Sequence, residues 1–431
     1  MRIGRIPIQI LFLLILVTPA SAESPSPEQR ESRRRFILIP MADPLAEFDA
    51  NRMVWHSSVE LFNSGGNALI RFTGLDKSKP GRALHAGLSL YFSVGMSYYS
   101  HEIAHSYSNQ VRRHFWIDLS DWSNFVPAYI NHDALDIWNE EDLEYSSHHP
   151  FDRRINTLIT HSTAAGLYQD RLNSRFTARL SALNGSTGLT DGMAYCFSSI
   201  HEFEYIILAG NEPIGLYLNE HGYFADYNDV TGYIKNMGDF DIEISKDTWL
   251  IISGLSTMLS GQMWNSIHSA YRYVFHADPY TPNIRFDIGS GTTVSPPNFY
   301  LFPTLYGLYL DSETHIRGLF REKDDIFISL GTGLDRLGLE KTGPVDRLRF
   351  GAKYHPPGSF HFLDIAPFFY IDFTGGMKQT GHSVGVSVET GPYRRFFLTA
   401  TLEHNRGDII EQTIKFKDDG FYFIAGLGFR L

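Results

Sequence analysis

Cysteine and clustered positive charge are both scarce in this chain. Its 431 residues include a single cysteine, Cys196, so no internal disulfide framework is possible. The net charge is −11 and no long block of lysine and arginine occurs. Proteins that bind nucleic acid need a basic surface, so this composition argues against nucleic acid as a partner. The chain is 43% hydrophobic, which is too apolar for a disordered protein, and it is long enough for two or three domains.

The N-terminus has the pattern of an export signal. Residues 1–22 begin with Arg2 and Arg5, continue with an apolar stretch from Ile8 to Val17, and end in a short run of small residues. This order is typical of a cleaved signal peptide, and the apolar stretch is shorter than the roughly 20 residues of a membrane span. Residues 23–35 are rich in serine, proline and charge, which predicts a flexible lead-in. We therefore expect an exported protein.

Alternation with a period of two dominates the C-terminal third. Val384, Val386 and Val388 alternate with small or polar residues, and similar segments recur throughout residues 280–431. This pattern predicts antiparallel strands separated by glycine- and proline-containing turns. The expected strands lie at 283–290, 299–311, 313–321, 325–333, 347–354, 361–373, 383–389, 396–403, 411–417 and 421–431.

These strands resemble those of a bacterial outer-membrane β-barrel. Each is about ten residues long, as in such barrels, and alternate apolar residues run to Phe429 and Leu431 at the end of the chain. The resemblance implies a barrel of eight to ten strands in the outer membrane. A soluble antiparallel sandwich would show the same alternation and is the alternative.

The middle of the chain has a different character. Residues 83–112, 153–183, 189–210 and 245–275 are long and poor in glycine–proline punctuation, which predicts helices. Residues 248–271 contain no charged side chain, but several serines and other polar residues lower their hydrophobicity, so we interpret them as a buried helix. The fold class is therefore α+β, with a mainly helical domain at 81–275, a barrel at 280–431, and short strands or a cap at 36–80.

One motif carries specific chemistry. Residues 101–105 read His-Glu-Ile-Ala-His. On a helix, His101 and His105 project from the same face and can share a zinc ion. Glu102 can then act as general base on a zinc-bound water. No glycine-rich phosphate loop or Gly-x-Ser-x-Gly elbow competes with this assignment.

Here the chain resembles the zincin-type metallopeptidases, over about ten residues around the motif. Ser108 and Val111 stand where the metzincin subgroup has glycine and a third histidine, so the resemblance implies a gluzincin-like site whose third zinc ligand is a carboxylate on a later helix. Our first choice is Asp170, which shares a strip of small and polar residues with Gly166. Glu202 and Glu204 are the alternatives, and His201 beside them is either a ligand or a hydrogen-bond donor to an oxyanion.

The sequence thus predicts a zinc-dependent peptide hydrolase of the bacterial cell envelope. Its helical domain would lie in the periplasm or inside the barrel, with a peptide or another envelope component as substrate. Two alternatives remain: a non-enzymatic outer-membrane barrel with a structural helical insert, used in transport or assembly, and a zinc hydrolase that cleaves a non-peptide amide.

Overall fold

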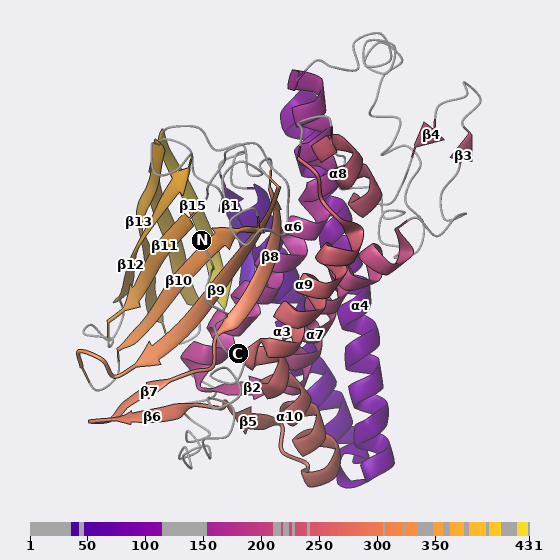
Figure 1. Cartoon of the computed structure of the whole chain (residues 1–431). Coiled ribbons are helices and arrows are strands. Elements are labelled where there is room, and N and C mark those ends of the chain that lie inside the picture. Colours follow the sequence, from indigo (N-terminus) through magenta and orange to yellow (C-terminus); the bar gives the residue numbers. More distant parts are fainter. Residues whose placement is uncertain are drawn as a thin grey trace, which may run out of the picture.

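The structure, a computed structural model, consists of a helical body and a large antiparallel sheet side by side (Figure 1). This bears out the α+β class. The signal peptide and lead-in predicted at 1–35 lie outside the described residues. The described ranges are 36–42, 47–113, 153–209, 217–218, 224–225, 229–238, 242–304, 307–321, 324–334, 348–356, 363–374, 379–393, 396–406 and 420–429.

The helical body contains all four predicted helical regions. Its helices are α3 (Glu47–Thr73), the short 3-10 helix η2 (Leu75–Lys77), α4 (Lys79–Arg113), α6 (Arg153–Asn184), α7 (Leu189–Leu208), α8 (Asp229–Gly238), α9 (Lys246–Leu259) and α10 (Gly261–His276). The stretch predicted as one helix at 245–275 is divided at Ser260, whose extended backbone ends α9 and caps α10. Helix α6 packs against α4, α7, α8 and the edge of the sheet, so it lies at the centre of the molecule.

Residues 36–80 differ from the expectation of short strands or a cap. The apolar run that starts at Phe36 forms strand β1 (Phe36–Ala42), but a helix of 27 residues, α3, follows it. The pair Gly65–Gly66 in its middle weakens the helical signal in the sequence. Its Trp55 and Val59 are buried against neighbouring helices, so tertiary packing stabilises this helix.

The large sheet has eleven described strands, ten of them in the region predicted as the barrel. In chain order these are β6 (Phe286–Gly289), β7 (Thr292–Val294), β8 (Asn298–Thr304), β9 (Gly307–Arg317), β10 (Asp325–Gly333), β11 (Leu348–His355), β12 (Leu363–Thr374), β13 (Gln379–Tyr393), β14 (Phe396–Arg406) and β15 (Gly420–Phe429). From β9 to β15, each strand pairs antiparallel with the next along the chain, and β1 adds to the edge of β15. Two small ladders complete the described strands: β2 (Ser186–Gly188) with β5 (Tyr280–Pro282), and β3 (Tyr217–Leu218) with β4 (Phe224–Ala225).

Several strand boundaries differ from the prediction, and the clearest case lies around Gly307. We expected strands at 299–311 and 313–321, but β8 ends at Thr304 and β9 begins at Gly307, whose φ of 95° suits glycine in a reversal of the chain. The strand predicted at 411–417 lies outside the described residues.

The two faces of the sheet carry opposite kinds of side chain. On the outward face, Leu330, Val384 and Phe423 are 55%, 52% and 51% exposed. Strand pairing sets such residues side by side, for example Leu402 opposite Phe423. The face turned inward is mainly polar, and the buried residues on it include Asp311, with aromatic residues such as Phe327 among them. This is the reverse of a water-soluble sheet, in which the apolar face is the buried one.

Helix α6 is joined to the inward face of the sheet by buried charges. Arg175 donates hydrogen bonds to Asp311 at 2.7 Å and to Glu313 at 3.2 Å. Arg179, one turn later, forms an ion pair with the same Glu313 and donates to Tyr370 at 3.0 Å. Because buried charges are costly unless they are paired, these contacts define one position of α6 against strand β9. None of the described helices combines the length and the hydropathy needed to cross a membrane.

Candidate metal centre

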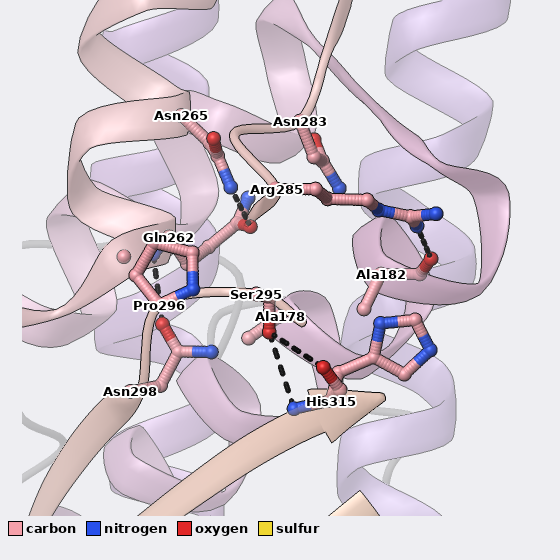
Figure 2. A pocket seen from close by; sticks show the side chains of 11 residues that line it. Ala178, Ala182, Gln262, Asn265, Asn283, Arg285, Ser295, Pro296, Asn298 and His315 are labelled. Atoms are coloured by element: carbon pink, nitrogen blue, oxygen red, sulfur yellow. Dashed lines mark hydrogen bonds between the residues drawn. The ribbon is translucent and has the colours of Figure 1, made fainter. Parts of the chain in front are cut away.

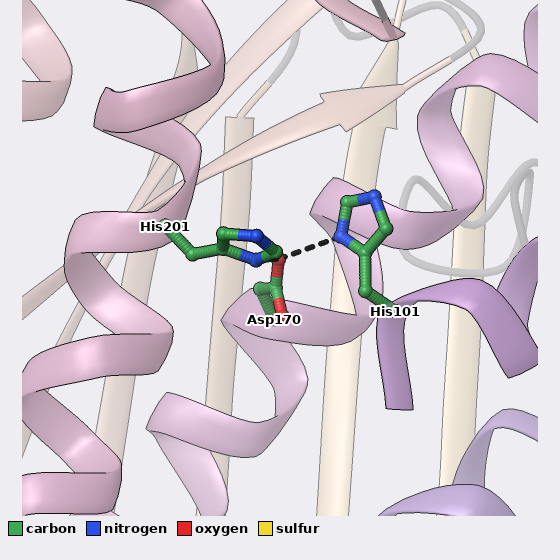
Figure 3. A group of neighbouring side chains, drawn as sticks. All are labelled: His101, Asp170 and His201. Atoms are coloured by element: carbon green, nitrogen blue, oxygen red, sulfur yellow. Dashed lines mark hydrogen bonds and ion pairs between the residues drawn. The ribbon is translucent and has the colours of Figure 1, made fainter. Parts of the chain in front are cut away.

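Helices α4, α6 and α7 bring three ionisable side chains together inside the helical body. His101 comes from α4, Asp170 from α6 and His201 from α7, and all three are fully buried (Figure 3). The three residues are far apart in the sequence, so their meeting depends on the packing of the helices. One ligand atom from each lies within 4.8 Å of the others.

Asp170 is the link between the two imidazole rings. Its Oδ2 lies 2.8 Å from Nδ1 of His101 and 2.8 Å from Nδ1 of His201. A second carboxylate completes the group, because Oδ2 of Asp229, the first residue of α8, lies 2.8 Å from Nε2 of His101. The His101 ring therefore has a carboxylate oxygen at each nitrogen.

Gly166 makes room for the His101 ring. A Cβ atom at this position would lie 2.3 Å from Nε2 of His101 and 2.4 Å from Cδ2, much closer than atoms in contact approach. The glycine lies one turn before Asp170 on α6, so the absence of a side chain at Gly166 allows His101 to reach the carboxylate.

Polar contacts next to the cluster hold the helices in position. Asn173 of α6 donates to Oγ of Ser100 at 2.9 Å, and Asn51 of α3 donates to the backbone carbonyl of Ser100 at 2.7 Å. Ser100 directly precedes His101 in the sequence. These two hydrogen bonds therefore link α3, α4 and α6 next to the cluster. Amide and hydroxyl hydrogen bonds of this kind are specific in geometry and oppose sliding of one helix past another.

Charge and burial act in opposite directions on the two central groups. Burial alone would lower the pKa of His101, but the charges and hydrogen bonds of Asp170 and Asp229 outweigh it and raise this pKa well above its ordinary value. Burial would likewise raise the pKa of Asp170, but the two histidines lower it. The carboxylates therefore favour positive charge at this place, and a metal ion would have to displace the proton of His101, because a metal binds the neutral imidazole.

The donor set is suitable for a metal ion. Two imidazoles and one carboxylate are common ligands of zinc and of other divalent transition metals. Among the described atoms, Oδ1 of Asp170 and Nε2 of His201 are buried without a hydrogen-bond partner. Such atoms are costly to bury unless a ligand or water binds them. His101, Asp170 and His201 are thus the described residues that could hold a metal, with Asp229 placed to orient His101.

The predicted site residues fall into three groups: those in the cluster, those whose side chains lie outside the described part of the structure, and those with other contacts. The structure brings His101 and Asp170, two of the three predicted ligands, into contact. Glu102 and His105 lie on α4, one and four residues after His101, but their side chains lie outside the described part of the structure. For Glu202 the structure gives a separate role: it forms an ion pair with Arg171 and accepts hydrogen bonds from Trp249 and Ser253.

Glu204, the other alternative, is half-buried on α7 and does not belong to the cluster formed by the described residues. For His201 the sequence leaves two roles open, ligand or oxyanion donor, and its contact with Asp170 favours a place among the ligands. Asp229 was missed. An acidic residue at the start of a helix ordinarily stabilises the helix N-terminus, so its sequence context gave no sign of a role at the site.

A second feature, a small cavity between α6, α10 and the sheet, lies apart from this cluster. Its volume is about 10 Å³, roughly that needed for one water molecule. Four of the side chains around it are amides (Figure 2). Two of these bind backbone groups: Asn298 accepts from the backbone N–H of Gln262 at 2.8 Å, and Asn265 accepts from that of Ile284 at 2.8 Å. The cavity is therefore part of the joint between helix and sheet.

Comparisons with known proteins add no assignment to this geometry. No protein-family model, no curated protein and no solved structure matches the chain.

Proposed function

We propose that this protein is a zinc-dependent peptide hydrolase of the bacterial cell envelope. The observation that carries the proposal is the buried cluster of His101, Asp170 and His201. His101 is also the first histidine of the His-Glu-x-x-His pattern on α4, so the motif and the cluster point to the same place. Resemblance to the gluzincin-like metallopeptidases supports the choice of zinc and of peptide hydrolysis.

Each residue of the site would have a distinct role in the reaction. His101 and Asp170 would hold the metal, with His201 or His105 as the third ligand. A bound zinc ion would supply Lewis-acid activation of water and of the carbonyl that is attacked. Glu102 would accept the proton of the attacking water and pass it to the leaving amine. Asp229 would keep the ring of His101 in one orientation.

We further propose that the sheet is a barrel in the outer membrane, in contact with lipid. Support comes from its two faces, because the outward side chains are large, apolar and exposed while the inward ones are polar and buried. Transmembrane barrels have this arrangement. The predicted signal peptide supports export. The test is extraction of the mature protein from the envelope: we expect it only with detergent, and a protein soluble without detergent would favour a sandwich.

The metal assignment is tested by measuring the zinc content of the purified full chain. We expect about one zinc per chain in the wild type and almost none in the His101→Ala and Asp170→Ala variants. His268→Ala, which removes an exposed histidine elsewhere in the helical body, is the matched control and should keep its zinc. Comparison of His105→Ala with His201→Ala identifies the third ligand. A folded wild type without zinc or another divalent metal would refute the proposal.

The reaction is tested with casein and with envelope-derived peptides as substrates. Glu102→Gln should abolish cleavage while the zinc content stays unchanged, since the variant removes the proton acceptor and keeps the metal ligands. Undiminished cleavage by this variant would refute the role of Glu102. A zinc-loaded protein that cleaves no peptide would instead favour a non-peptide amide as substrate.

A further inference from the structure

The helical body has an exposed apolar surface of its own. On α10, Trp264, Ile267, Tyr271 and Phe275 follow one another at helical spacing and are 53%, 50%, 53% and 50% exposed. The neighbouring helices contribute further residues of the same kind. We call this surface the helical apolar face and define it as Leu84, Leu88 and Tyr91 of α4, Ile251, Leu255 and Met258 of α9, and the four residues of α10.

The opposite sides of the same helices are buried and polar. On α4, Ser89, Ser93 and Ser97 recur every fourth residue, and none is exposed. On α9 and α10, the buried positions include Ser253 and Asn265. A helix in a water-soluble protein turns its apolar stripe to the core and its polar stripe to solvent. On these three helices the exposed side is mainly apolar and the buried side mainly polar, although Trp249, Met263 and Tyr273 also lie in the core.

We propose that the helical apolar face contacts the acyl chains of the same bilayer as the sheet. This inference rests on the membrane location proposed above, but not on the metal or on the reaction. It replaces the expectation of a helical domain in the periplasm or inside the barrel. Helices and sheet would then lie at the same depth, with lipid around both.

The indole of Trp264, a polar group on this face, fits an apolar surrounding because the protein itself satisfies it. The indole N–H of the exposed Trp264 donates to the backbone carbonyl of Met258 at 2.9 Å. Groups in contact with lipid must find their partners within the protein, whereas an exposed indole in water has no such need.

The distribution of charge agrees with this placement. Residues 248–271 hold no charged side chain, and Lys246, Asp247 and Arg272 lie immediately beyond the two ends of the stretch. His268 is the polar exception among the exposed residues of this stretch. Uncharged surface bounded by charged residues is typical of a segment that contacts the hydrocarbon layer.

Lipid fits better than a protein partner because of where the apolar faces lie. A typical partner covers about 800 Å² on one side of a molecule. Here the sheet and the helical body both turn apolar side chains outward, and they lie on opposite sides of the structure (Figure 1). A bilayer surrounds a protein and covers both faces at once.

The test is nitroxide accessibility in proteoliposomes of the full chain. Leu255→Cys and Ile267→Cys report on the helical apolar face, Leu402→Cys reports on the sheet, and Ser78→Cys, in the exposed turn before α4, is the aqueous control. All are made in a Cys196→Ala background. We expect labels at 255, 267 and 402 to be reached by oxygen and not by a water-soluble nickel complex, with the opposite result at 78.

The outcomes separate the two proposals. Labels at 255 and 267 that the nickel complex reaches, with 402 protected, would overturn the inference and leave the sheet in the membrane. Access of the complex to all of these positions would refute the membrane location itself. Labels at 255 and 267 that neither reagent reaches would indicate a protein partner or a second copy, and would also overturn the inference.

Discussion

Gly166→Ala tests whether the His101 contacts organise the helical body. At an ordinary helix position this change stabilises a protein, because alanine is favoured over glycine by about 1 kcal/mol. At Gly166 the new Cβ would lie 2.3 to 2.5 Å from three atoms of the His101 ring. The ring must move, and it then loses its 2.8 Å contacts with Asp170 and Asp229.

The magnitude follows from these contacts. Overfilling a packed site costs about 1–3 kcal/mol, and each hydrogen bond to a charged group contributes about 1.5–3 kcal/mol. Loss of one such bond together with the overlap exceeds the gain in helix propensity. We expect the free energy of unfolding of Gly166→Ala to fall by about 2 kcal/mol or more, and its zinc content to fall well below that of the wild type.

Two further variants make the test specific. Gly65 is exposed on α3, and apart from the adjacent residues and backbone of its own helix no atom lies within 4 Å of its Cβ position. Gly65→Ala should therefore be stabilising by up to about 1 kcal/mol. In a His101→Ala background the overlap is gone, and Gly166→Ala should become stabilising as well. Urea unfolding followed by circular dichroism measures the wild type, the three single variants and the His101→Ala/Gly166→Ala double variant. If Gly166→Ala behaves like Gly65→Ala in the wild-type background and keeps its zinc, the geometry argued here is wrong.

Three shorter predictions concern other parts of the fold. Glu202→Gln should retain zinc but lower the free energy of unfolding by about 3–5 kcal/mol, because Arg171 stays buried without its charged partner; loss of zinc from a folded variant would make Glu202 a ligand. Glu313→Gln should cost a similar amount in urea unfolding for the same reason, whereas Asp287→Asn, at an exposed residue, should stay within about 0.5 kcal/mol of wild type. Burial raises the pKa of Cys196 to about 11, so its alkylation at pH 8 should be slow in the folded protein and fast in urea, and equal rates would contradict this burial.

The strands were predictable because alternation is a local property. The strand at 325–333 has the predicted bounds, and neighbouring segments differ by a few residues. Alternation alone does not tell which face of a sheet is buried. In β10, Leu330 is exposed and Ser329 is buried. This choice of face follows from the placement of α6, and the sequence of β10 carries no information about that helix.

The site was predictable only where a motif or a neighbouring residue marked it. His101 belongs to a recognisable pattern, and Gly166 pointed to Asp170 because a small residue allows two helices to approach closely. The meeting of His201 and Asp229 with these residues depends on how α7 and α8 pack. No local pattern encodes that packing, so only the three-dimensional structure reveals the complete group.

The buried charges of α6 connect the metal centre with the sheet. Asp170 lies between the two histidines, and Arg175 and Arg179 follow at roughly one-turn intervals to bind Asp311 and Glu313. Buried ion pairs contribute little net stability compared with apolar packing, and their best-attested use is to select one register. A slip of α6 along β9 would break these pairs and would carry Asp170 out of hydrogen-bonding reach of both rings. We therefore attribute these buried ion pairs to positioning. Two imidazoles and a carboxylate act as one site only if α6 keeps a single register against the sheet.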